Sequence, residues 1–209
     1  MNIEDLLQGP LKNVILDNIT SQLGVNDTNK ASSALDTTIN VLMNAMAKNA
    51  SSPDGAGSLV NAVTRDHDGS ILDNITDYFS GQFQPQNPSA INGKGILDHL
   101  LGGKQETAAS TIGKETGMDA GQIMKMMAMV APILMGVLGK ANQNTQNAPS
   151  GGGLIDMLLN STKKINSQSN QGGLLSQILD KDGDGSIMDD VAGMGFKSIL
   201  GRLFKVKIS

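Results

Sequence analysis

The chain has 209 residues, enough for one large domain or two small ones. Its net charge of −4 gives no basic surface for nucleic acid, and the absence of cysteine excludes disulfides, thiolate metal sites and cysteine nucleophiles. With 12 methionines, 4 phenylalanines, 1 tyrosine and no tryptophan, the core must consist of aliphatic side chains and adaptable methionine.

The N-terminal residues 1–5 lack the basic region and apolar run of a secretory signal peptide. The longest uncharged apolar stretch covers residues 126–139, which is too short to span a bilayer and is typical of a buried core helix. These features predict a protein without a transmembrane segment. They also predict a cytoplasmic location, and they leave export without a signal peptide open.

Apolar residues recur at helical spacing through the first part of the chain. The stripes cover residues 3–7, 11–23, 31–46, 56–63 and 71–79. Gly24 follows the second stripe, where a glycine commonly ends a helix. Asn26 or Asp27 can cap the next helix, and Ser52 followed by Pro53 is a typical helix start.

The pattern restarts after a polar segment with two prolines, residues 82–94, which we interpret as a linker. Residues 96–103 then echo residues 3–9. Residues 133–140 parallel residues 41–48 at an offset of 92. We therefore expect an internal duplication of a helical unit.

Because no segment alternates with the two-residue period of a strand, we expect an all-α fold, a multihelical array. The first unit covers residues 1–81 with an acidic turn, 82–94 is the linker, and 95–209 is the second unit with its own acidic turn. Two polar stretches in the second unit, 141–153 and 160–173, predict loops. The units are short enough to share one core.

Residues 123–138 are apolar on nearly every side, and we expect this helix to be central, contacted by several elements or by a second subunit. Pro132 lies inside it and should kink the helix or end its first half. Its methionines are Met124, Met126, Met127, Met129 and Met135.

The strongest motif is an Asp-rich turn that occurs twice. Its second copy reads Asp180, Lys181, Asp182, Gly183, Asp184, Gly185, Ser186 and Ile187, which matches the first eight positions of an EF-hand calcium loop. Alternate carboxylates suit a hard cation that takes six to eight oxygens, and Gly185 permits the sharp turn. The closing Glu of an EF-hand is replaced by Val191, so Asp189 or water would complete the ligand shell.

The first copy is less complete, because Thr64 stands where the first Asp belongs and His67 separates two acids. Asp73 would have to close the shell. We expect modest calcium affinity, weaker in this copy. The candidate calcium ligands are Asp180, Asp182, Asp184, Ser186 and Asp189 in the second turn, and Asp66, Asp68, Ser70 and Asp73 in the first.

Turn and cap chemistry offers an explanation without metal. Asp-Gly is a turn signal, and residues 70–73 and 186–189 each resemble a capping box, with Ser at the helix start and an acid three residues on. Capping does not explain why Asp180, Asp182 and Asp184 crowd together, since a cation would relieve their repulsion.

Four segments of the chain are distinctive: residues 3–9 (IEDLLQG), 49–55 (NASSPDG), 65–73 (RDHDGSILD) and 96–104 (ILDHLLGGK). In these segments the sequence resembles the bacterial YidB-like family, a domain of unknown function. The resemblance covers about the first 140 residues, and the acidic turn returns near the end. It implies a helical bacterial protein and supplies no activity, cofactor or site residue.

No catalytic constellation is evident. His67 and His99 are far apart in sequence, no Gly-x-Ser-x-Gly elbow occurs, and residues 102–105 lack the spacing of a phosphate loop. We therefore expect a non-enzymatic helical protein that binds calcium through EF-hand-like loops, with a mainly structural metal. The alternative is a metal-independent protein that assembles with itself or with a protein partner through its helices.

Overall fold

The computed structural model describes residue 7 and residues 9–144, 152–168 and 172–179. The described chain folds into helices and contains no strand, which confirms the all-α prediction. The helices are α2 (Pro10–Leu23), α3 (Thr28–Ala50), α4 (Pro53–Arg65), α5 (Ser70–Asp73), α6 (Ile75–Ser80), η1 (Pro88–Ile91), α7 (Gly93–Leu101), η2 (Gly102–Lys104), α8 (Gln105–Thr116), α9 (Ala120–Asn144), α10 (Gly152–Gln168) and α11 (Gly172–Leu179).

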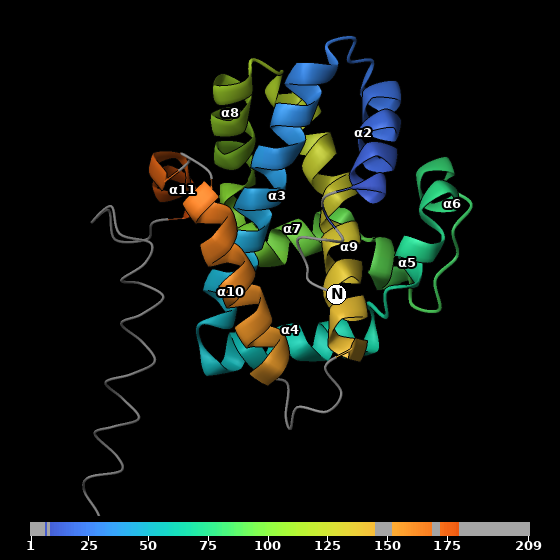
Figure 1. Ribbon diagram of the computed structural model, residues 1–209, viewed down its shortest axis with the longest axis vertical. Helices are drawn as coiled ribbons and strands as arrows, with labels where there is room; N and C mark the ends of the chain where they lie inside the picture. The colour runs from blue at the N-terminus through green and yellow to red at the C-terminus, as the bar shows by residue number, and fades with distance from the viewer. Residues whose placement is uncertain (1–6, 8, 145–151, 169–171, 180–209) are drawn as a thin grey trace, which may run out of the picture.

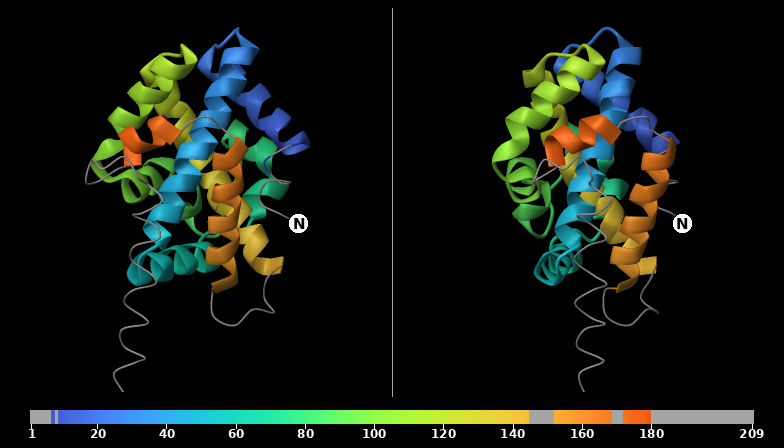
Figure 2. Two further views of the ribbon diagram at one scale, coloured as in Figure 1. Left: turned by 60° about the vertical axis from the view of Figure 1, so that its left-hand side comes forward. Right: turned by 90° about the vertical axis from the view of Figure 1, so that its left-hand side faces the viewer.

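Two long helices, α3 and α9, form the centre of the molecule and pack against each other (Figure 1). Helices α2, α4, α8 and α10 contact α3, and α4, α5, α7 and α8 contact α9. The views in Figure 2 show the shorter helices arranged around this pair. The side chains of Met126, Met127 and Ile133 are fully buried. The prediction that residues 123–138 form a central helix is therefore confirmed, with all of these contacts made by the same chain.

The helix ends follow the local sequence. Gly24 ends α2 in the left-handed conformation with φ of 63°. Asp27 caps α3 by accepting a hydrogen bond from the N–H of Lys30, and Ser52 caps α4 by accepting from the N–H of Gly55. These caps satisfy backbone donors that a helix start leaves without partners.

Helix α9 continues through Pro132 to Asn144, so the expectation that this proline could end the helix is wrong. Proline has no N–H to donate to the carbonyl of Ala128, one turn earlier. The neighbouring carbonyl of Met129 accepts a hydrogen bond of 2.9 Å from the hydroxyl of Tyr78. Packing from α6 thus supplies a hydrogen bond to the carbonyl next to that of Ala128, one residue from the interrupted position.

The two predicted units share a single core, because one cluster of buried residues contains side chains from both sides of residues 82–94. The long helices begin at positions 92 residues apart, Thr28 and Ala120, each after a left-handed glycine. Helix α8, at Gln105–Thr116, also lies close to the position that this offset gives from α2, at Pro10–Leu23. The duplication of a whole helical unit is not confirmed.

Two loop predictions need correction. Residues 160–168 belong to α10, and residues 141–144 continue α9, although their polar composition predicted loops. In α10, Leu154 and Leu158 are buried against the core. Their burial stabilises the whole helix, polar residues included. The predicted linker, 82–94, contains η1 and the start of α7.

Helix α9 is the one described helix with the length and apolar composition of a membrane span. However, 67% of its apolar window is buried inside the protein. Its apolar residues are thus accounted for by packing against the other helices.

Candidate functional site

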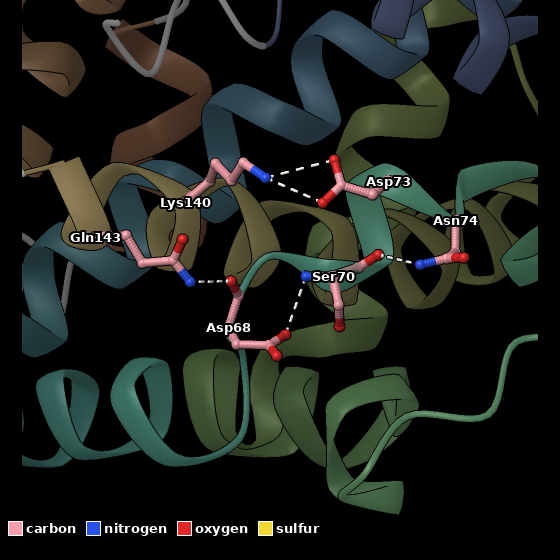
Figure 3. A network of polar contacts seen from close by, with 6 residues as sticks. All are labelled: Asp68, Ser70, Asp73, Asn74, Lys140 and Gln143. Carbon is pink, nitrogen blue, oxygen red and sulfur yellow. Dashed lines mark hydrogen bonds and ion pairs between the residues drawn. The ribbon is translucent and has the colours of Figure 1, made fainter.

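The first acidic turn connects α4 to α5 and lies against the C-terminal half of α9 (Figure 3). Gly69 adopts the left-handed conformation with φ of 86°, which a residue with a side chain rarely adopts. Ile71, two residues later, is buried with 4% of its surface exposed. The turn therefore has the glycine conformation and the buried apolar anchor that the sixth and eighth EF-hand positions require.

Asp66 is held by groups of the protein itself. Its two carboxylate oxygens accept hydrogen bonds of 2.8 and 2.9 Å from the Nε and Nη2 atoms of Arg65. Its Oδ1 also accepts from Asn87, at 2.5 Å. These contacts, led by Arg65, lower the pKa of the Asp66 carboxyl below its ordinary value. The carboxylate is consequently satisfied without a metal.

Asp68 caps the short helix α5. Its Oδ1 accepts a hydrogen bond of 2.9 Å from the N–H of Ser70, and its backbone carbonyl accepts from the side chain of Gln143 on α9. The side chain and N–H of Ser70 lower the pKa of Asp68. The reciprocal bond of the predicted capping box over residues 70–73 is absent from the described contacts, because the N–H of Ser70 is bonded to Asp68 and the carboxylate of Asp73 is paired with Lys140.

Asp73 points to a different partner. Its carboxylate forms an ion pair of 3.0 Å with the Nζ atom of Lys140 on α9. Both side chains are well exposed, at 66% for Asp73 and 37% for Lys140, so this pair contributes little to stability. Its position nevertheless directs the carboxylate toward α9 and away from Asp68, as Figure 3 shows.

The carboxylates of the first turn thus do not converge. Among the residues that the structure describes, no three His, Asp or Glu side chains are grouped closely enough to hold a metal ion. Asp66, Asp68 and Asp73 each have a separate protein partner in this structure. The second turn, residues 180–190, lies outside the described residues. Helix α11 ends at Leu179, directly before Asp180.

The first turn lies unusually close to α9 because two glycines of that helix face it. A side chain at Gly136 would overlap the side chain of Ile71. A side chain at Gly139 would overlap the backbone carbonyl of His67. The turn that follows α4 is therefore packed tightly against α9.

Substitution of Asp68 should separate capping from metal binding. We expect Asp68→Ala to lower the free energy of unfolding by about 1 kcal/mol. Asp68→Asn should keep most of the wild-type stability, since Asn also caps helices. Urea unfolding in the presence of chelator measures the stability of both variants.

The stabilisation that Asp68 provides should depend on pH. Because the pKa of Asp68 is lowered in the fold, this stabilisation is present above the ordinary carboxyl pKa and is lost as the pH falls. The difference between wild type and Asp68→Ala should therefore shrink in acid. Equal stability of the three proteins at pH 7 would contradict the capping role.

Sequence reasoning missed one feature of this region. His67 and His99, 32 positions apart, line the same cavity, which has a volume of about 660 Å³. His67 lies in the acidic turn and His99 in a separate helix, and no spacing in the sequence pairs the two residues. Both α4, which precedes His67, and α7, which carries His99, pack against α3 and α9, and this places the two histidines on the walls of one cavity.

The protein is therefore all-α, with one hydrophobic core and an acidic turn packed against its central helix, α9. The chain belongs to the family described as bacterial protein of unknown function (DUF937), whose family model matches residues 5–141. The resemblance to the YidB-like family is thereby confirmed. No curated protein and no solved structure matches the chain. The match includes the first acidic turn and ends before the second.

Proposed function

We propose that this is a non-enzymatic helical protein that binds calcium through its second acidic turn, with the metal in a structural role. In this proposal the first turn, which is similar in sequence to the second, is held by protein contacts and needs no metal. Asp180, Asp182, Asp184, Ser186 and Asp189 are the proposed ligands. This proposal narrows the sequence-based prediction, which assigned ligands to both turns.

The observation that carries the proposal is the shape of the first turn. Gly69 is left-handed and Ile71 is buried, and the second turn has Gly185 and Ile187 at the equivalent positions. Asp180, Asp182 and Asp184 also have the alternate spacing of the first three ligands of a calcium loop.

The two turns differ in their ligand sets. Thr64 of the first turn is replaced by Asp180 in the second, which supplies the missing first ligand. In the second turn five acids, the last being Asp190, lie within eleven residues, and Lys181 is the only cation among them. Calcium would relieve the repulsion between these carboxylates.

The arrangement of the histidines supports a non-enzymatic role. Ser52, which lines the cavity with both histidines, uses its hydroxyl to accept from Gly55 and to donate to Asn49. In the described part of the chain, no serine of the cavity is hydrogen-bonded to His67 or His99, as a nucleophile and its base would be. The cytoplasmic location stays a prediction.

Thermal melting with calcium and with chelator tests the proposal. A metal bound only to the folded state adds about 2.7 kcal/mol of stability at a hundredfold excess over its Kd. For a chain of this size that corresponds to a rise in Tm of about 5–10 °C. We expect Asp184→Ala to abolish most of the rise. Magnesium should substitute poorly, because it demands tighter octahedral geometry.

Asp68→Ala is the matched control, because it removes the equivalent acid of the first turn. It should lower Tm by the same amount with and without calcium. If calcium and chelator give one melting curve for the wild type, the calcium proposal fails. The metal-independent interaction protein then becomes the better explanation, and sedimentation of the purified chain would show whether it self-associates.

A further inference from the structure

The cavity beside the first turn has the size and lining of a small-molecule site. It lies between α4, η1 and α7, at the end of α3, and its volume of about 660 Å³ is within the range of ligand pockets. Figure 1 shows α4 crossing the foot of α3 and α9, with α7 passing behind. The walls come from segments distant in sequence, which the folded core holds in place.

One part of the lining is apolar. Met46 and Met135, from the two central helices, and Leu59 from α4 contribute buried side chains. Flexible methionine side chains can adapt to the shape of a hydrocarbon group. The remainder carries uncharged polar side chains, among them the exposed Ser58 and Asn61. The cavity therefore suits a ligand with an apolar body and a polar end.

His67 is the buried polar group of this cavity. Only 6% of its surface is exposed, and within the described residues its side chain makes no hydrogen bond. No fully buried side-chain nitrogen or oxygen of a described residue lacks a partner, so the imidazole nitrogens must reach accessible space. The space that His67 lines is this cavity. A ligand could supply the missing partners.

Two charged side chains on the cavity wall form an ion pair with each other. Arg65 and Asp66, the charged pair on its wall, neutralise each other through two hydrogen bonds. In its neutral form the buried imidazole of His67 presents one hydrogen-bond donor and one acceptor. An uncharged amide has the complementary acceptor and donor.

We propose that this cavity binds an amphipathic small molecule whose uncharged amide-like head pairs with His67. Its hydrocarbon body packs against Met46, Leu59 and Met135. The described residues that line the cavity all lie between Met46 and Met135 in the sequence.

Three probes of matched shape test the ligand class: hexanamide, hexanoate and hexylammonium. The chain has 2 histidines, so NMR of the imidazole rings resolves each, and His99→Gln assigns the remaining signal to His67. At pH 7.5 we expect hexanamide to shift the His67 ring signals saturably, with a Kd on the order of 1–10 mM. Hexanoate and hexylammonium should bind about tenfold more weakly or not at all.

Two tryptophan substitutions on α4 locate the site. Asn61→Trp places a large ring over the cavity, whereas Thr64→Trp alters an exposed position on the same helix that does not line it. Asn61→Trp should weaken hexanamide binding at least about tenfold, and Thr64→Trp should leave it unchanged. Melting curves verify that both variants fold. The proposal is overturned if hexanamide gives no saturable shift at His67, if a charged probe binds as tightly, or if Asn61→Trp binds normally.

Discussion

Replacing Gly139 with alanine is expected to lower the free energy of unfolding by about 3 kcal/mol, the upper part of the usual range for an overpacked site. The added methyl group would overlap the backbone carbonyl of His67. A backbone carbonyl cannot rotate away as a flexible side chain can, so the turn and α9 would have to separate. Chemical denaturation measures the loss, and Tm should fall by about 6–12 °C.

Gly57→Ala is the matched control for this substitution. Gly57 lies inside α4, and a methyl group there would meet no atom within 4 Å. Alanine should stabilise this helix by about 0.5–1 kcal/mol, because glycine loses more backbone entropy on folding. If Gly139→Ala were as stable as the wild type, the close contact between the first turn and α9 would be wrong.

Truncation of Ile133 to alanine should also be severe, at about 2–5 kcal/mol. Ile133 lies on α9 at the centre of the core with no exposed surface. Its removal loses the transfer free energy of three carbon atoms and leaves a cavity, which the surrounding helices fill only in part. Urea unfolding with an unchanged m-value would show that the loss is one of stability.

The same substitution at Ile91 provides the comparison. Ile91 is the exposed large apolar residue of the described chain, at 37% exposure, and it lies at the end of η1. Ile91→Ala should cost less than about 1 kcal/mol, because little apolar area is lost from the core. Equal effects at the two positions would mean that α9 is not the central helix.

Local features of this protein follow from the sequence alone. The spacing of apolar residues identified the helices that carry a clear stripe, including the central one around Ile133. Gly24, Asp27 and Ser52 marked helix ends correctly, because a cap depends on atoms only a few residues away. The absence of two-residue alternation correctly predicted an all-α fold.

Polar composition was a poor guide where helices pack on the core. Residues 160–168 are rich in polar side chains and predicted a loop, yet they are helical in α10. Pro132 was expected to interrupt α9, yet the helix continues and Tyr78 donates to the carbonyl of Met129 nearby. In both cases tertiary contacts outweigh the local preference, which amounts to a few tenths of a kcal/mol per ordinary residue and about 3 kcal/mol for proline.

The chemistry of the acidic turn was decided by the tertiary structure. The sequence alone indicated a turn with a glycine and neighbouring carboxylates, since Asp-x-Asp-Gly is a turn signal that depends only on adjacent residues. The partners of Asp66 and Asp73, however, include Asn87 and Lys140, which are 21 and 67 positions away. The cavity lined by both His67 and His99 likewise exists only when α4 and α7 are packed against α3 and α9. Local hydrogen bonds form within a few residues and leave a pattern in the sequence, whereas these contacts depend on how whole helices pack.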